Sequence, residues 1–159
     1  MKRNSTIFFQ VVVVALGILA LATMIRLPLT EGRALNLDLF SIYSDPFIVY
    51  GYLASIAFFV ALQQVFKLLG YIGQNKVFSL DSVKALRNIK YCAITLSILI
   101  VLAALYIMMF HADGDDPAGF IAMCIVTTFI SIVIATLAAR FERVLQKAVD
   151  MKSENDIRV

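Results

Sequence analysis

Four long apolar stretches without a single Asp, Glu, Lys or Arg constrain this chain more than any other feature. They cover residues 4–25, 46–66, 91–112 and 117–139. A helix rises about 1.5 Å per residue, so each stretch is long enough to cross a hydrocarbon layer about 30 Å thick. Only helices and closed barrels satisfy their backbones in lipid, and these stretches lack the alternation of barrel strands. The sequence therefore predicts an all-α, polytopic integral membrane four-helix bundle.

The predicted bundle is a single domain that takes up residues 1–159. Its four spans cover about residues 6–26, 46–69, 89–111 and 118–140. The composition agrees, because 61% of the residues are hydrophobic and 16% are charged. Typical soluble domains are about half apolar and about a quarter charged.

The N-terminus resembles a signal peptide at first sight. Lys2 and Arg3 precede an apolar run, and Ala20-Leu21-Ala22 has the small residues of a cleavage site. The run continues to Arg26, however, which is longer than a signal peptide needs. We therefore expect a retained first span.

The basic residues fall almost entirely on one side of the predicted membrane. The other side carries only Arg26 and Arg33. Basic residues close to the spans stay in the cytoplasm, so we expect both termini and the middle loop inside, with an N-in, C-in topology. This basic face suits the headgroups of anionic lipids. Direct binding of nucleic acid is not expected, because no aromatic and basic platform accompanies the charge. The basic residues on this side are Lys2, Arg3, Lys67, Lys76, Lys84, Arg87, Lys90, Arg140, Arg143, Lys147, Lys152 and Arg158.

The first outer loop contains an alternating segment. Residues 34–39 (ALNLDL) alternate apolar and polar side chains, which predicts a short strand on the membrane surface. Phe40, Ile42 and Tyr43 are then expected at the level of the headgroups. A loop that seals the bundle is favoured over an external lid or binding surface.

The second outer loop offers four candidate metal ligands, which are His111, Asp113, Asp115 and Asp116. Their spacing does not match an EF-hand, which needs a distal glutamate and more oxygen ligands. A solvated acidic turn is favoured over a metal site. The two cysteines, Cys92 and Cys124, are expected at different depths in antiparallel spans, too far apart for a disulfide.

Two inner segments are predicted to continue spans three and four beyond the membrane as helices. They are residues 80–90 and 140–152, and no Gly or Pro separates either from its span. Ser79 is the expected N-cap of the first, with Asp81 in its first turn. The second carries an apolar stripe that must be buried, formed by Phe141, Val144, Leu145, Ala148 and Met151.

Mutual packing of these two inner helices is favoured, and a docking surface for another protein is the alternative. The candidate docking residues are Phe78, Leu86, Arg87, Leu145, Glu154, Asn155 and Asp156.

The spans themselves contain small and neutral polar residues but no charge near the midplane. Proton-coupled transporters and pumps place ionisable groups there. A bis-His haem needs two histidines, and the chain has one. No catalytic triad or aspartyl dyad is present, so neither an enzyme nor a cofactor is expected. Small side chains allow close helix approach, and packing is favoured over a polar conduit. The candidate helix-packing residues are Ala57, Ala61, Thr127, Ser131, Ala135 and Ala139.

Two inner motifs resemble those of a known family. Residues 78–89 (FSLDSVKALRNI) fit the pattern F-S-x-(E/D)-(N/S)-x-x-x-L-(K/R)-x-I, and the ending ENDIRV is similar to E-N-D-L-T-V/I, with Arg158 in place of the usual Thr. The chain thus resembles the bacterial four-helix membrane family catalogued as domain of unknown function 2975. The resemblance implies a multi-pass protein of the bacterial plasma (inner) membrane. It also implies a candidate cytoplasmic partner, a Cro/CI-type helix-turn-helix regulator encoded nearby, and it carries over no catalytic residue.

Two functions of different classes remain open. The first is a regulatory or interaction protein whose inner helices hold a cytoplasmic partner. The second is a small transport or permeation protein that works as a homo-oligomer. The organised inner segments favour the first, and a charge at the midplane would have favoured the second.

Overall fold

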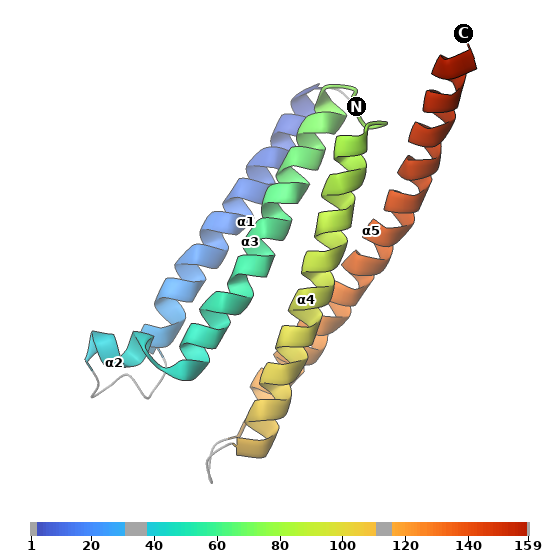
Figure 1. The fold of residues 1–159 in the computed structure, drawn as a ribbon. Coiled ribbons are helices and arrows are strands. Elements are labelled where there is room, and N and C mark those ends of the chain that lie inside the picture. The colour runs from blue at the N-terminus through green and yellow to red at the C-terminus, as the bar shows by residue number, and fades with distance from the viewer. Residues whose placement is uncertain (1–2, 31–37, 111–115, 159) are drawn as a thin grey trace.

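The structure, a computed structural model, is all-helical in the residues that it describes, which are 3–30, 38–110 and 116–158. Four long helices and one short one follow each other along the chain (Figure 1). They are α1 (Arg3–Thr30), α2 (Leu39–Tyr43), α3 (Pro46–Gly73), α4 (Leu80–Phe110) and α5 (Ala118–Arg158).

Local sequence signals fix where the long helices begin. Asp45 caps α3, since its side chain accepts a 2.8 Å hydrogen bond from the backbone N–H of Phe47, and Pro46 occupies the first turn. Asp116 Oδ1 accepts a 3.0 Å bond from the N–H of Ala118 at the start of α5. Ser79 caps α4 as the sequence predicts, because its Oγ accepts a 3.3 Å bond from the N–H of Ser82.

Helix α3 ends in a Schellman motif. Asn75 has a φ of 57°, in the left-handed region that asparagine tolerates better than most residues. The Lys76 N–H then donates to the carbonyl of Tyr71 (2.8 Å), and the Asn75 N–H donates to that of Ile72 (3.2 Å). These two bonds satisfy carbonyls that the helix end would otherwise leave open, and they turn the chain back towards α4.

The long helices lie in an open row, in the order α1, α3, α4, α5 (Figure 1). The contact between α4 and α5 is the most extensive, followed by α3 with α4 and then α1 with α3. Among the described residues, α1 makes no substantial contact with α5, so the row does not close into a ring. Along the helix axes, the beginning of α1 and the end of α5 lie at the same end of the molecule (Figure 1). We call this the basic end, defined by Lys67, Lys76, Lys84, Arg87, Lys90, Arg140, Arg143, Lys147 and Lys152.

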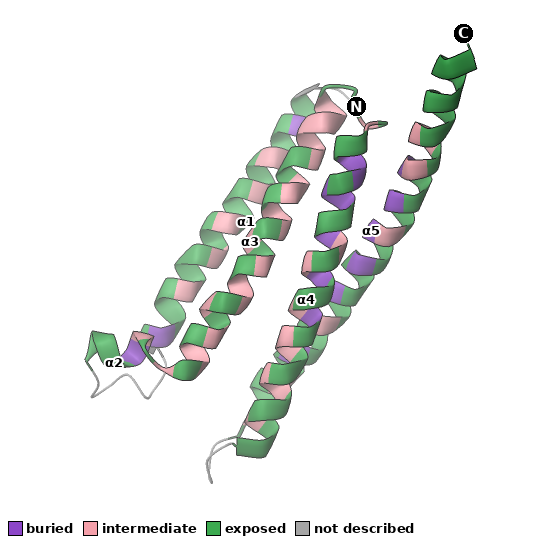
Figure 2. Ribbon diagram, viewed as in Figure 1, coloured by how far each residue is buried: buried purple, intermediate pink, exposed green. Residues whose placement is uncertain are grey.

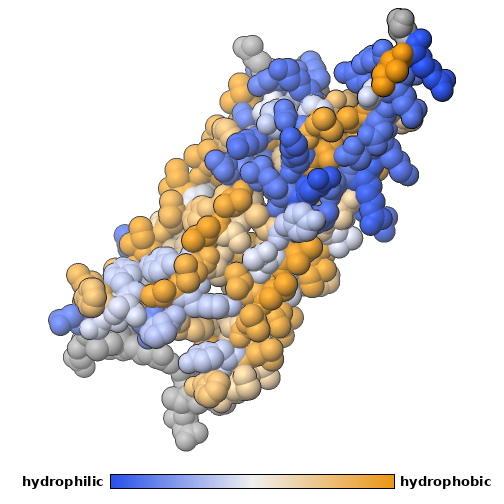
Figure 3. Space-filling view, viewed as in Figure 1, coloured by the Kyte–Doolittle hydropathy of each residue, from blue (hydrophilic) through white to orange (hydrophobic). Residues whose placement is uncertain are grey.

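Most apolar side chains of the long helices face outward. All four helices are long and apolar enough to cross a membrane, so each long helix is a candidate span, as the sequence predicts. Buried residues gather on α4 and α5, whereas α1 and α3 are mainly exposed or half-buried (Figure 2). The apolar surface continues along the row, and the polar surface gathers at the basic end (Figure 3). Exposed apolar surface of this extent fits a protein surrounded by lipid.

The strand predicted at residues 34–39 is wrong at its described end. Leu39 begins helix α2, while residues 34–37 lie outside the described part of the chain. The N–H of Ile42 bonds to the carbonyl of Asp38 (3.1 Å), which closes a helical turn. Burial of the Ile42 side chain stabilises that helical turn. It outweighs the preference for a strand that alternating apolar and polar residues give over so short a segment. Phe40 is 84% exposed and Tyr43 is half-buried.

Pro28 lies inside the last turns of α1 and is buried. A proline has no N–H, so the carbonyl of Met24, four residues earlier, loses its helical partner. The hydroxyl of Tyr52 on α3 donates to that carbonyl at 3.1 Å. The Tyr43 hydroxyl of α2 donates to the next carbonyl, that of Ile25, at 3.0 Å. Neighbouring elements therefore satisfy the backbone that the proline opens, as lipid-embedded helices require.

This arrangement predicts coupling between Pro28 and Tyr52. Tyr52→Phe should lower the free energy of unfolding in detergent by about 1 kcal/mol, because it leaves the Met24 carbonyl without a donor. In a Pro28→Ala background the new N–H can serve the Met24 carbonyl, so the same substitution should cost much less. A double-mutant cycle measured by thermal or denaturant unfolding checks this. Equal costs of Tyr52→Phe in both backgrounds would contradict the assignment.

Candidate functional site

Helix α5 packs on α4 along one narrow face. Its buried residues, together with the half-buried Thr128 and Val149, are spaced alternately four and three apart, as in a coiled-coil seam. Most of them are small, which allows the two helix backbones to approach closely. The seam consists of Cys124, Thr128, Ser131, Ala135, Ala138, Glu142, Leu145 and Val149.

The predicted packing ladder coincides with this seam in part. Ser131 and Ala135 are buried and Ala139 is half-buried, as are Ala57 and Ala61 on α3. Thr127 is exposed, which corrects the prediction. The reason is geometric, because a strict four-residue repeat drifts by about 40° per step around a helix. The seam avoids this drift through its three-residue steps.

Hydroxyl groups in the spans bond to their own helix. The side chains of Thr23, Ser97, Thr127 and Thr136 each donate to the carbonyl four residues earlier, at 2.7–2.9 Å. Such bonds satisfy a hydroxyl inside lipid without a partner helix. These hydroxyl groups are thus satisfied within their own helices, and they need no polar conduit to lie in a span.

Near the basic end the α4–α5 contact becomes a small apolar core. Val83, Leu86 and Leu145 form its buried centre. Half-buried Leu68 and Val77 pack on it from α3 and the connection after it, and Val149 from α5. Two of the candidate docking residues, Leu86 and Leu145, are therefore enclosed between α4 and α5. They take part in the mutual packing that the sequence favoured.

The start of α4 is fixed by a compact network of hydroxyl groups. Ser82 is fully buried, and its Oγ lies 3.2 Å from Ser79 Oγ and 3.2 Å from the carbonyl of Lys76. One serine thus ties the first turn of α4 to the connection from α3. Phe78 and Ser79, at the start of this network, line a hollow that the end of α5 also lines.

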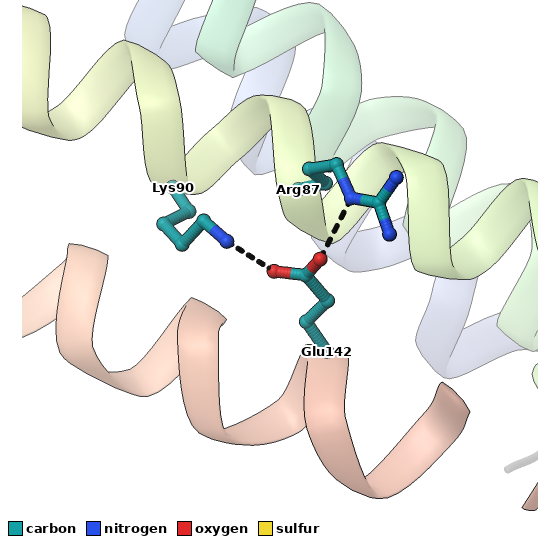
Figure 4. Close-up of polar contacts among 3 residues, drawn as sticks. All are labelled: Arg87, Lys90 and Glu142. Carbon is teal, nitrogen blue, oxygen red and sulfur yellow. Dashed lines mark hydrogen bonds and ion pairs between the residues drawn. The ribbon is translucent and has the colours of Figure 1, made fainter. Parts of the chain in front are cut away.

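Glu142 is the central charged residue of this end (Figure 4). It lies on α5 between two cations of α4: Arg87 Nε donates to Oε1 at 2.8 Å, and Lys90 Nζ donates to Oε2 at 2.6 Å. The Glu142 side chain is only 11% exposed, Lys90 is 21% exposed and Arg87 is 49% exposed. One carboxylate therefore joins two successive turns of α4 to α5, and each of its oxygens has a charged donor.

Opposing effects act on the pKa of Glu142. Burial alone would raise the pKa of its carboxyl group. The hydrogen bonds and charges of Lys90 and Arg87 outweigh burial and leave this pKa below its ordinary value. The bond to Glu142 likewise raises the pKa of Arg87. Glu142 and Arg87 are thus both charged at neutral pH.

The remaining candidate docking residues lie on the surface of the basic end. Phe78 is exposed beside α4. Glu154, Asn155 and Asp156 are exposed in the last turns of α5, which continues as a helix to Arg158. Phe78 also lines an open hollow of about 500 Å³, together with Asn75, Lys76, Ser79, Ala148, Met151 and Lys152. Arg87 is half-exposed and is held by Glu142.

The apolar stripe predicted to be buried on α5 is wrong in three places. Phe141, Val144 and Met151 are exposed, whereas Leu145 is buried and Ala148 is half-buried. The seam turns Glu142, Leu145 and Val149 towards α4, which rotates the other apolar residues away from it. An exposed apolar strip, formed by Phe141, Val144 and Met151, therefore runs along the end of α5.

The structure gives little support for a metal or thiol centre. The described residues contain no group of three or more His, Cys, Asp and Glu side chains that could hold a metal ion. His111, Asp113 and Asp115 lie outside the described residues, and Asp116 caps α5. Cys92 and Cys124 are both free thiols, in agreement with the prediction.

Sequence reasoning missed Glu142 and Tyr52. Glu142 stands between basic residues in the run Arg140-Phe141-Glu142-Arg143, which reads as ordinary surface charge. The available signal was its spacing, four residues after Ala138 and three before Leu145 on the seam. Tyr52 could have been sought as a donor for the carbonyl that Pro28 leaves open.

The lowered pKa of Glu142 predicts a pH dependence. The charged pairs should contribute stability above about pH 4.3, the ordinary pKa of glutamate, and lose it as the pH falls through the lower pKa of the folded protein. Glu142→Gln should cost about 1–3 kcal/mol of unfolding free energy at pH 7, because it removes the charge that both cations face. Thermal unfolding in detergent between about pH 7 and pH 3 measures both effects.

Asp150→Asn is the matched control, since Asp150 is an exposed carboxylate on the same helix, hydrogen-bonded by Gln146 at 2.8 Å. It should change stability little at any pH. If Glu142→Gln and the unmodified protein lose stability equally on acidification, Glu142 does not carry the acid dependence.

Comparisons with known proteins agree with this architecture. Residues 29–159 match the family described as "Protein of unknown function (DUF2975)". The chain is also 43% identical over 161 aligned residues, and over the full length of both proteins, to the "Uncharacterized membrane protein YoaS" of Bacillus subtilis (strain 168). No solved structure matches it. This membrane protein, with its four long apolar helices, therefore belongs to the DUF2975 family.

Proposed function

We propose that this protein is a non-enzymatic interaction protein of the bacterial plasma membrane, which holds a cytoplasmic regulator on the ends of α4 and α5. The basic end then faces the cytoplasm, in keeping with the preference of Lys and Arg for that side. The candidate partner is a small helix-turn-helix regulator of the Cro/CI type, as the family resemblance implies.

The observation that carries the proposal is the exposed apolar strip on a helix far longer than a membrane requires. Helix α5 has 41 residues, about 60 Å at 1.5 Å per residue, against a hydrocarbon layer of about 30 Å. Its charge-free part ends at Ala139, so we expect the strip of Phe141, Val144 and Met151 to run from the level of the headgroups away from the hydrocarbon layer. Apolar side chains exposed to water on a helix are typical of a surface that binds another protein.

The pairing of α4 and α5 supports the same function. The apolar core around Leu86 and the Glu142 ion pairs hold the two helices together beyond their charge-free segments. A partner would therefore meet a preformed surface and would not have to order it on binding, which favours affinity. Anionic lipids are a second class of partner, attracted by the basic residues.

The open row of helices gives less support to the alternative, a transport or permeation protein. Among the described residues, α1 and α5 do not pack together, so one chain encloses no path between its helices. Transport would require several copies arranged around a common axis. A homo-oligomer of that kind remains the competing hypothesis in the experiment below.

The proposal predicts that Val144→Asp abolishes recovery of the partner from native membranes. The matched control is Phe40→Asp, which alters another exposed apolar residue, on α2 at the opposite end. Deletion of residues 153–159 should also reduce recovery, because residues 153–158 are the exposed end of α5. All three variants should keep their melting temperature to within about 2 °C, since surface changes usually cost under 0.5 kcal/mol.

The readout is the amount of helix-turn-helix regulator that co-purifies with the tagged protein, determined by mass spectrometry. Recovery that is equal for Val144→Asp, the deletion and the unmodified protein would contradict the proposal. Solute flux into vesicles that contain the purified protein, without any recovered partner, would favour the transport hypothesis.

A further inference from the structure

A basic hollow lies where the charge-free segments of α4 and α5 end. It measures about 460 Å³ and is lined by Lys90, Ala139, Glu142, Arg143, Gln146 and Lys147. Ala139 is the last residue of the charge-free stretch of α5, and Tyr91 is the first of that of α4. The hollow therefore lies at the depth where the hydrocarbon layer meets the headgroups.

The charges around the hollow leave a positive excess. Both oxygens of Glu142, the only acid in the lining, are occupied by Arg87 and Lys90. Arg143 and Lys147 form no ion pair among the described residues, and their side chains are exposed. Gln146 is hydrogen-bonded to Asp150, which itself lies outside the lining. Two unpaired cations, one turn apart on α5, thus flank a cavity whose own acid is already neutralised.

An aromatic ring lies next to Lys90, another residue of the lining. The ammonium group of Lys90 lies 4.9 Å from the ring centre of Tyr91, and Tyr91 is 57% exposed. A tyrosine ring at this level is typical of the membrane interface. Farther along α4, the exposed side chains of Ile94 and Ile98 continue into the apolar part of the helix.

We propose that this hollow binds the phosphate of an anionic phospholipid headgroup, with Arg143 and Lys147 as its cationic contacts. An arginine fork and a lysine ammonium together suit a phosphodiester, and the apolar path beside Tyr91 takes the acyl chains. A free phosphate would use the same cations, but it would gain nothing from the apolar path. The site lies beside the Glu142 pairs, so a bound lipid stabilises the contact between α4 and α5. The inference does not depend on the protein partner proposed above.

The test measures melting temperature in a neutral detergent with added phosphatidylglycerol, phosphatidylcholine or inorganic phosphate. Phosphatidylglycerol at about 100 times its dissociation constant should raise the melting temperature by about 5–10 °C. Phosphatidylcholine and inorganic phosphate at the same concentration should leave it unchanged. The double variant Arg143→Gln/Lys147→Gln should lose the rise with phosphatidylglycerol.

The matched control is Lys84→Gln/Lys152→Gln, which removes two exposed basic residues of the same end that lie outside the hollow. It should keep the full rise, and a single Arg143→Glu variant should abolish it. Melting in phosphatidylcholine shows whether each variant is folded. If both double variants lost the rise in melting temperature equally, the basic end would attract the lipid without a specific site, and the proposal would be overturned. A rise produced by inorganic phosphate would overturn the assignment to a lipid.

Discussion

The packing of α4 on α5 at the basic end depends on one buried carboxylate that needs charged partners. Glu142 is enclosed between two helices, where an unpaired charge would be costly, and Arg87 and Lys90 supply a donor to each of its oxygens. The pairing fixes the rotation of α5, because Glu142 can meet both cations from one face only. Leu145 and Val149 then turn towards α4, and Phe141 and Val144 turn away from it. The apolar strip on which the proposed function rests is thus a consequence of the ion pairs.

Within the spans, the structure follows the rules of a solvent that offers no hydrogen bonds. Helices gain little from burying apolar groups in one another when lipid is equally apolar, so α5 packs on α4 through small side chains. Hydroxyl groups bond to their own helices, and Tyr52 supplies the donor that Pro28 removes. The row as a whole has little buried interior, and its strongest contact is the α4–α5 pair, whose ends carry the candidate docking strip and the basic hollow.

The sequence alone predicts the features that depend on local chemistry. The four spans follow from the cost of charge in lipid, and the Ser79 cap follows from the residues around it. Features that depend on how two helices face each other are missed. The predicted four-residue ladder included Thr127 in the helix contact. The seam also contains three-residue steps, which depend on how α5 faces α4 and were therefore not predicted. Glu142 resembled an ordinary surface charge for the same reason. The alternation at residues 34–39 predicted a strand and gave no sign that Ile42 is buried and stabilises α2.

We propose that α4 and α5 leave the membrane together at Glu142 and reach the cytoplasm. Single cysteines at Ser44, Val144 and Ser153, in a background without Cys92 and Cys124, test it by labelling with an impermeant maleimide. All three positions are exposed, and Ser44 lies at the opposite end from the other two. We expect position 44 to react in intact cells, and positions 144 and 153 to react only in inverted vesicles. Reaction of positions 44 and 153 from the same side, or protection of position 144 from both sides, would contradict it.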